Sequence, residues 1–252
     1  MSRVVAIAGS KGGVGSTTTA VNLAAALTYF TRDVSLVDAN LSNPHVGVHL
    51  GAPHVPINLN HVMRGDHHIL NASYSHRSGA RIIPASIKLE DSRNSSLKDL
   101  RLHLNGLKSD LVLLDVASGV SEHAEHGIAA ADEVLLVVNP EITSITDGLR
   151  TLKLSRKLAK PIRGVVLSRT GSPADLPRQN VEQILGYRVI SEIPEDHYVR
   201  LSLHRKQAVV DSYPNSPSAM AYRKLAADLT GQKLAEDNLS WVERLMRSLG
   251  FR

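Results

Sequence analysis

The sequence contains no cysteine, and this absence excludes several kinds of site. None of its 252 residues can form a disulfide, a thiolate zinc site or a cysteine-ligated iron–sulfur cluster. Aromatic residues make up only 4% of the chain. This low content argues against a surface that stacks the bases of single-stranded nucleic acid. Function must therefore depend on other side chains and on the backbone.

Long hydrophobic runs are also absent. No apolar stretch approaches the ~18 residues that a membrane span requires, and the N-terminus lacks the pattern of a secretory signal. We therefore expect a cytoplasmic protein. The formal net charge is +5. This mild excess favours acidic partners, either nucleic acid or anionic lipid, without choosing between them.

Apolar runs alternate with helical patterns along residues 1–230. Strands are expected at Val4–Gly9, Val34–Asp38, Ala80–Ala85, Leu111–Asp115, Glu133–Asn139, Ile162–Ser168 and Tyr187–Pro194. Helices are expected at Thr17–Thr28, Leu97–Leu107, Ala124–Ala131, Thr146–Leu158, Pro177–Leu185 and Ser216–Thr230. Strands that are apolar on both faces and separated by helices predict a doubly wound α/β domain with a mostly parallel sheet.

The loop after the first strand is glycine-rich and is the expected phosphate site. Ligands of an open parallel sheet bind beyond the carboxyl ends of its strands. Gly12, Gly13 and Gly15 let backbone N–H groups converge on an anion, and the following helix adds its positive end. Thr17 supplies a hydroxyl where Mg²⁺ needs one, and Asp115 ends an apolar strand where a second-sphere carboxylate belongs. The plainer alternative is a strand–helix turn that binds nothing.

Five segments carry a resemblance to a known family. "SKGGVGSTTTAVNLAAAL" resembles the deviant Walker A motif of the MinD/ParA P-loop ATPases, in which an additional lysine, here Lys11, precedes the glycines. "LVDANLSNPHVGVHLG" and "LVLLDVASGV" resemble switch I and the Walker B strand with switch II. "AADEVLLVVNPEITSITDGLR" is similar to the MinD branch, and "ISEIPED" resembles the stretch beside the adenine. The resemblance covers about residues 3–230 and implies a P-loop NTPase fold.

The resemblance also implies ligands and roles. It implies ATP or ADP with Mg²⁺, held in a homodimer in which Lys11 reaches the partner's phosphates. The implied nucleotide-binding residues are Lys11, Gly12, Gly13, Val14, Gly15, Ser16, Thr17, Thr18, Asp115, Pro194 and Asp196. Mg²⁺ would be held by Thr17 directly, and by Asp38 and Asp115 through water. The implied catalytic residues are Lys11, Asp38 and Asn40.

Four positions depart from the family pattern. Ser16 stands where the family has the P-loop lysine, and losing one side of a desolvated charge pair costs about 2–5 kcal/mol. Asn40 replaces a carboxylate that positions the attacking water, and losing a general base costs about 10²–10⁴ in rate. Ala117 replaces a switch II proline, and Ser168 replaces an asparagine commonly used to recognise adenine.

These departures predict weakened nucleotide binding with slow or absent hydrolysis. In one alternative Lys11 compensates for Ser16 and a partner stimulates hydrolysis. An engineered substitution at Ser16 is another alternative.

The C-terminal segment has a different composition. We expect residues 231–238 to form a polar linker and Leu239–Arg252 to form an amphipathic helix. Its apolar stripe contains Leu239, Val242, Leu245, Met246 and Leu249, with Trp241 at the margin and arginines on the polar side. This pattern is typical of a helix at an anionic membrane surface, and MinD proteins, which the chain resembles, carry such a helix. The alternative is a terminal helix that packs on its own domain.

Three functions are compatible with these patterns. The first is a MinD-like dimer at the inner face of the cell membrane that positions cell-division or polar machinery, controlled by a protein activator. The second is a nucleotide-independent pseudo-ATPase scaffold that pairs with an active paralogue. The third is a ParA-like DNA-binding partition protein that uses the basic stretch Leu149–Lys160. The many histidines of residues 45–76 match no common metal-ligand spacing, which favours a solvated surface.

Overall fold

One mixed sheet forms the centre of the computed structural model, which describes residues 2–31, 33–88, 90, 91 and 95–232. Its eight strands follow the order β3-β4-β2-β5-β1-β6-β7-β8. They are β1 (Arg3–Gly9), β2 (Val34–Ala39), β3 (Tyr74–Ser75), β4 (Arg81–Ile83), β5 (Leu111–Val116), β6 (Glu133–Val138), β7 (Ile162–Thr170) and β8 (Val189–Pro194). Every neighbouring pair is parallel except β3 and β4.

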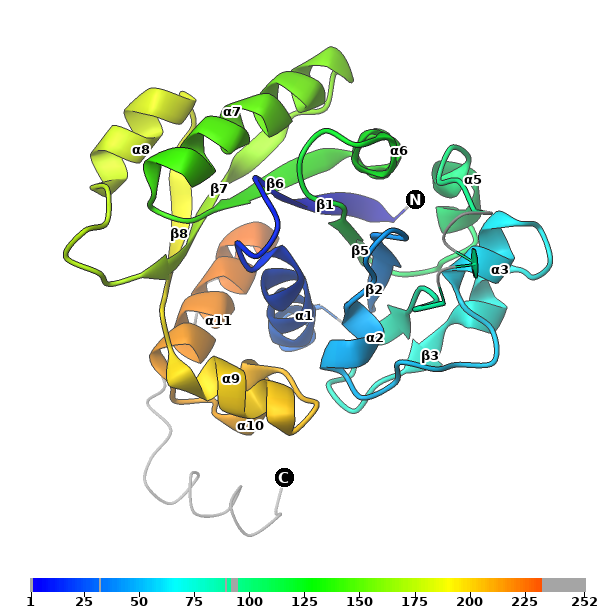
Figure 1. The fold of residues 1–252 in the computed structure, drawn as a ribbon. Helices are drawn as coiled ribbons and strands as arrows, with labels where there is room; N and C mark the ends of the chain where they lie inside the picture. Colours follow the sequence, from blue (N-terminus) through cyan, green and yellow to red (C-terminus); the bar gives the residue numbers. More distant parts are fainter. Residues whose placement is uncertain (1, 32, 89, 92–94, 233–252) are drawn as a thin grey trace, which may run out of the picture.

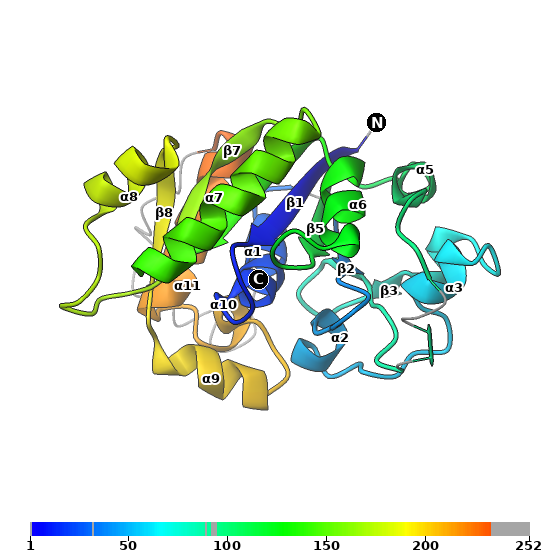
Figure 2. The same cartoon turned by 45° about the horizontal axis from the view of Figure 1, so that its top comes forward.

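Helices cover both faces of this sheet (Figures 1 and 2). They are α1 (Ser16–Leu27), α2 (Val46–His49), α3 (Leu59–Met63), the 3₁₀ helix η1 (Ile69–Ala72), α5 (Leu100–Leu104), α6 (Glu122–Ala130), α7 (Ile142–Lys157), α8 (Arg178–Leu185), α9 (His197–His204), α10 (Val209–Ser212) and α11 (Pro217–Thr230). Alternate residues of β1 point to opposite faces: Val5 and Ile7 pack with α1 and α11, whereas Val4 and Ala6 pack with α5 and α6. The predicted doubly wound fold is confirmed.

The differences from the predicted elements are concentrated in short segments. All seven predicted strands are present, and β3 is added as a two-residue antiparallel edge. The helix expected at Leu97–Leu107 is shortened to α5, and α7 begins at Ile142, four residues before the predicted start. The short helices α2, α3, α9 and α10 and η1 were not predicted, because elements of four to eight residues show too few turns for a periodicity.

Helix α1 is held in place by its own burial and by one polar side chain. Nine of its residues, Thr19 to Leu27, are buried. Asn22 donates from Nδ2 to the Thr18 carbonyl at 2.8 Å and accepts from the Val209 backbone N–H at 2.7 Å. The start of α1 is therefore fixed to α10 as well as to the sheet.

The predicted linker from residue 233 and the predicted helix Leu239–Arg252 lie outside the described residues, so the domain boundaries stay predictions. Within the part that is described, no helix combines the length and hydrophobicity needed to cross a membrane.

Candidate nucleotide site

The loop between β1 and α1 provides backbone N–H groups for an anion. Gly13 and Gly15 adopt φ values of 82° and 92°, which glycine accepts without strain. A Cβ placed on Gly12 or Gly13 would meet no atom within 4 Å, so this side of the loop is open. Gly15 is the N-cap of α1 and gives no side-chain cap, so the first-turn N–H groups have no side-chain acceptor there. The loop can therefore surround a phosphate.

Two buried carboxyl groups lie beside this loop. Asp38 and Asp115 are paired residues on the adjacent parallel strands β2 and β5, and they are 0% and 1% exposed. The Thr17 hydroxyl donates to Asp115 Oδ2 at 2.7 Å. Asp38 accepts from the backbone N–H groups of Asn40 at 3.3 Å and Val46 at 3.0 Å. Asp115 Oδ1 is buried with no hydrogen-bond partner.

The electrostatics of this pair fit a divalent cation. Burial, reinforced by the nearby Asp115, raises the pKa of Asp38 well above its ordinary value. Burial also raises the pKa of Asp115 to about 7, although the hydrogen bond from Thr17 opposes the shift. Mg²⁺ prefers oxygen ligands and retains water molecules. The Thr17 hydroxyl can serve as a ligand, and the unpartnered Asp115 Oδ1 can accept from a metal-bound water.

Ser16 and Asn40 are the departures from the family pattern that affect phosphate binding and hydrolysis, and both lie at defined positions in the structure. Ser16 begins α1, and its hydroxyl would lie 3.1 Å from a Cβ on Gly9. The Ser118 hydroxyl would lie 2.8 Å from the same Cβ, so a side chain at Gly9 would require the two serine hydroxyls to shift. Asn40 Oδ1 accepts from the Asn43 N–H at 3.3 Å and is thus engaged within its own loop. Ala117, at the switch II position, is buried.

Lys11 is held by the start of α7. Its Nζ lies 3.3 Å from Glu141 Oε2 and 3.2 Å from the Thr143 hydroxyl. The Glu141 side chain is largely exposed, and exposed pairs of this kind contribute at most about 1 kcal/mol. Lys11 can therefore leave Glu141 for a phosphate at little cost.

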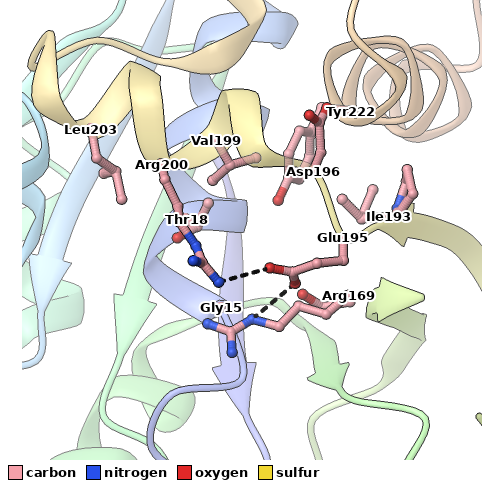
Figure 3. Close-up of a pocket in the computed structure, with 12 residues that line it drawn as sticks. Gly15, Thr18, Arg169, Ile193, Glu195, Asp196, Val199, Arg200, Leu203 and Tyr222 are labelled. Carbon is pink, nitrogen blue, oxygen red and sulfur yellow. Dashed lines mark ion pairs between the residues drawn. The ribbon is translucent and has the colours of Figure 1, made fainter. Parts of the chain in front are cut away.

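A pocket of about 110 Å³ continues from the phosphate loop (Figure 3). Its lining residues are Gly15, Thr18, Ser168, Arg169, Ile193, Pro194, Glu195, Asp196, Val199, Arg200, Leu203 and Tyr222. Gly15 and Thr18 belong to the phosphate loop and its helix, so a ligand can occupy both. The apolar part of the wall suits a flat nucleobase, and small-molecule pockets are commonly lined in this way.

The predicted residues Pro194 and Asp196 both line this pocket. However, the Asp196 carboxylate already accepts from the Tyr198 N–H at 2.9 Å and the Ser218 hydroxyl at 2.7 Å. Burial opposes ionisation of Asp196, but these hydrogen bonds prevail and lower its pKa. Asp196 therefore shapes the pocket by capping α9. The sequence did not point to Arg169, Glu195 and Arg200, although Glu195 falls within the adenine-bordering "ISEIPED".

The structure thus brings the predicted residues 11–18, Asp38, Asn40 and Asp115 to one edge of the sheet, beside Pro194 and Asp196. The predicted membrane residues Trp241, Val242, Leu245, Met246 and Leu249 lie outside the described residues. Among the described residues, no cluster of three or more His, Asp or Glu side chains forms a separate metal site.

The glycine loop, the Thr17–Asp115 pair and the adjoining pocket define a P-loop nucleotide-binding domain. A family model described as an AAA domain matches residues 2–162. An uncharacterized ATP-binding protein of Methanocaldococcus jannaschii is 32% identical over 256 residues, covering 99% of this chain and 97% of the relative. The antiactivator FleN of Pseudomonas aeruginosa is 29% identical over 264 residues, covering 97% and 94%.

A solved structure agrees with these relatives. The septum site-determining protein MinD of Pyrococcus horikoshii, complexed with Mg-ADP, superposes with a TM-score of 0.86 at 29% identity. The match covers 96% of this chain and 99% of that protein. The chain belongs to the MinD/ParA family of P-loop ATPases.

Proposed function

We propose that the protein is a MinD-like nucleotide switch with weak or absent hydrolysis. It binds ATP or ADP with Mg²⁺, dimerises around the nucleotide and associates with the inner face of the cell membrane to position cell-division or polar machinery. The observation that carries the proposal is the Thr17–Asp115 hydrogen bond beside buried Asp38, next to an open glycine loop. The Mg-ADP complex of the related MinD supports the choice of ligand.

Different residues of the chain bind the phosphates, the cation and the base at this site. The loop N–H groups bind the phosphates, Thr17 and the Asp38–Asp115 pair hold the cation, and the apolar pocket binds the base. Mg²⁺, when bound, neutralises phosphate charge. Asn40 can orient a water molecule through its amide but cannot accept a proton. For that reason we expect the protein to retain nucleotide binding while ATP hydrolysis is slow or absent.

Dimerisation is supported by the surface around Lys11. Val120 and Ile142 are apolar and 57% and 60% exposed. Gly119, which precedes Val120, donates to the carbonyl of Gly9 at the end of β1, and Glu141, which precedes Ile142, pairs with Lys11 of the phosphate loop. Exposed apolar side chains beside a ligand site favour a protein interface there. A second copy covering this face would also enclose the nucleotide.

A Lys11→Ala variant is expected to bind Mg-ATP but to remain monomeric. Calorimetry with ATP and Mg²⁺ measures binding, and light scattering after size-exclusion chromatography measures mass. Lys157→Ala is the control, since Lys157 also forms one partly exposed ion pair, with Glu125 at 3.0 Å. Absence of heat with ATP in the unaltered protein would contradict the proposed function. An unchanged dimer in Lys11→Ala would contradict the role of Lys11.

Removal of Leu239–Arg252 is expected to abolish binding to anionic liposomes without changing ATP affinity. The reason is that the predicted helix supplies the apolar and cationic contacts, and a dimer presents two copies with high effective concentration. Liposome co-sedimentation with and without Mg-ATP measures this effect. Replacing Leu245 with glutamate in the full chain should reproduce it. Full retention of liposome binding by both variants would contradict a membrane-binding role for this segment.

DNA binding through α7 is less well supported. Arg150 pairs with Asp147, Lys157 pairs with Glu125, and Arg156 lies over the Tyr187 ring at 5.4 Å. These basic side chains therefore already have intramolecular partners. A solvated helix face explains them more simply than a phosphate-binding surface.

A further inference from the structure

A groove lies on a different side of helix α9 from the base pocket. It has a volume of about 410 Å³ and lies between α9, α10 and the first residues of α11, three elements that are neighbours in Figures 1 and 2. Val199, Arg200 and Leu203 of α9 line the base pocket, whereas Tyr198 lines the groove. The groove and the base pocket are therefore separate sites that share one helix.

Four side chains form a row along this groove. The His197 ring centroid lies 4.1 Å from that of Tyr198, and the Tyr198 centroid lies 4.7 Å from that of Tyr213. The Arg205 guanidinium lies 4.8 Å from the Tyr213 ring centroid. We call these four residues the aromatic row. Both tyrosines also pack against the buried core on the α1 side of the sheet, so the row is firmly anchored.

The Arg205 end of the groove is cationic. Residues 197–217 contain a single acidic residue, Asp211, which is partly buried and already faces two arginines of neighbouring segments. Among the described residues, no carboxylate forms an ion pair with Arg205 or with its neighbour Lys206. The Tyr213 ring holds the Arg205 guanidinium in place but leaves its N–H donors available. An anionic partner would therefore meet a fixed positive charge.

The rest of the groove suits a peptide better than a nucleic acid. Each tyrosine ring contacts two neighbours in the aromatic row, so little of its face is free for the base stacking on which single-strand binding depends. The ring edges and phenolic hydroxyls remain, and within the described chain neither hydroxyl is hydrogen-bonded. Pro214 and Pro217 add apolar walls with a fixed backbone φ. Phenolic hydroxyls donate to peptide carbonyl groups, and tyrosine and arginine commonly dominate protein interfaces.

We propose that this groove docks an extended acidic segment of a partner protein, an inference that goes beyond the nucleotide switch and does not depend on it. Carboxylates of the segment pair with Arg205, its backbone carbonyl groups accept from the Tyr198 and Tyr213 hydroxyls, and an apolar side chain packs against the two prolines. The net charge of +5 favours acidic partners in general, and the groove adds shape and hydrogen-bond donors to that preference. Because α9 also lines the base pocket, the docked partner lies close to the nucleotide site.

Selection from a phage library of random dodecapeptides tests this proposal, with the full-length protein as bait and Mg-ATP present. We expect the selected peptides to be enriched in aspartate and glutamate and to bind the protein in fluorescence anisotropy. Arg205→Glu should weaken their binding by about tenfold or more, the value of one charge-assisted hydrogen bond. Tyr213→Phe keeps the ring and removes the hydroxyl, so it should weaken their binding by about two- to tenfold.

Arg156→Glu is the matched control, because Arg156 is also an exposed arginine over a tyrosine ring, 5.4 Å from the Tyr187 centroid, and the change in charge is the same. It should leave peptide affinity unchanged. Neither Arg205 nor Tyr213 lines the base pocket, so an unchanged melting temperature and unchanged Mg-ATP binding in their variants show that the fold is intact.

Three results would overturn the docking proposal. They are a selection without acidic enrichment, equal peptide affinities of the Arg205→Glu and Arg156→Glu variants, and tighter binding of an oligothymidylate of the same length than of the selected peptides. Each of these results leaves the proposed nucleotide binding standing. Absence of ATP binding in the unaltered protein, in contrast, would overturn the proposed function and leave the groove proposal to be decided by the peptides.

Discussion

Restoring lysine at Ser16 and aspartate at Asn40 together is expected to raise ATP turnover by a factor of about 10² or more. The aspartate restores a group that can accept a proton from water, which is worth about 10²–10⁴ in rate. The lysine restores a positive charge at the phosphates, worth about 2–5 kcal/mol when such a pair is desolvated. These effects act on different steps, so the double variant should exceed both single variants.

The structure accommodates both substitutions. Ser16 is the first residue of α1 and is only partly buried, so a longer side chain can extend toward the loop. Aspartate at position 40 can accept the same hydrogen bond from the Asn43 N–H that Asn40 now accepts. A phosphate-release assay at saturating Mg-ATP measures turnover, and the double variant carrying Lys11→Ala tests whether dimerisation is still required. Robust ATP turnover by the unaltered protein would contradict the expected loss of hydrolysis.

Stability without Mg²⁺ is expected to fall as pH rises, because of the Asp38–Asp115 pair. Burial raises the pKa of Asp115 in the folded state to about 7, from an ordinary value of 3.8. Below about pH 4 the carboxyl group is protonated in both the folded and the unfolded state, so it does not change the free energy of unfolding. Between pH 4 and 7 only the unfolded state ionises fully, so the folded state is progressively disfavoured, and the loss persists above pH 7. The raised pKa of Asp38 acts in the same direction.

His49 opposes this trend at lower pH. Burial, together with His45 and Lys206, lowers the pKa of His49 from 6.5 to about 4. Its contribution to stability is therefore lost as pH falls from 6.5 toward 4 and is constant above that range. Urea unfolding from pH 6.5 to 8 therefore excludes the contribution of His49. There we expect the free energy of unfolding to decrease with pH without Mg²⁺, and to decrease less with Mg-ATP bound.

An Asp115→Asn variant separates the two roles of this carboxylate. It should be more stable than the unaltered protein at pH 8 without Mg²⁺, and it should lose most Mg-dependent nucleotide affinity. Asp211→Asn is the control, since burial also raises the pKa of Asp211 but this residue lies outside the nucleotide site. An Asp115→Asn protein that is less stable at pH 8, or binds Mg-ATP normally, would contradict this account of the pair.

The sheet and the phosphate site could be predicted because their signals are local. A continuous apolar run such as Leu111–Asp115 indicates a buried strand, and glycines directly after such a strand indicate the loop. The position of Lys11 could not be predicted, because Glu141 is 130 residues away in the chain. The meeting of Arg169, Glu195 and Arg200 was missed for a similar reason. A bulge at Arg169 and the capping of α9 decide where these side chains meet, and neither feature leaves a periodic pattern in the sequence.

Asn22 links the phosphate side of the nucleotide site to the side that holds the pocket wall. Through one side chain it joins the start of the phosphate-binding helix to α10, which continues from the pocket wall formed by α9. The helix that carries Ser16 and Thr17 is therefore tied to the segment beside the pocket wall, and we expect the phosphate side and the base side of the site to shift together when a nucleotide binds.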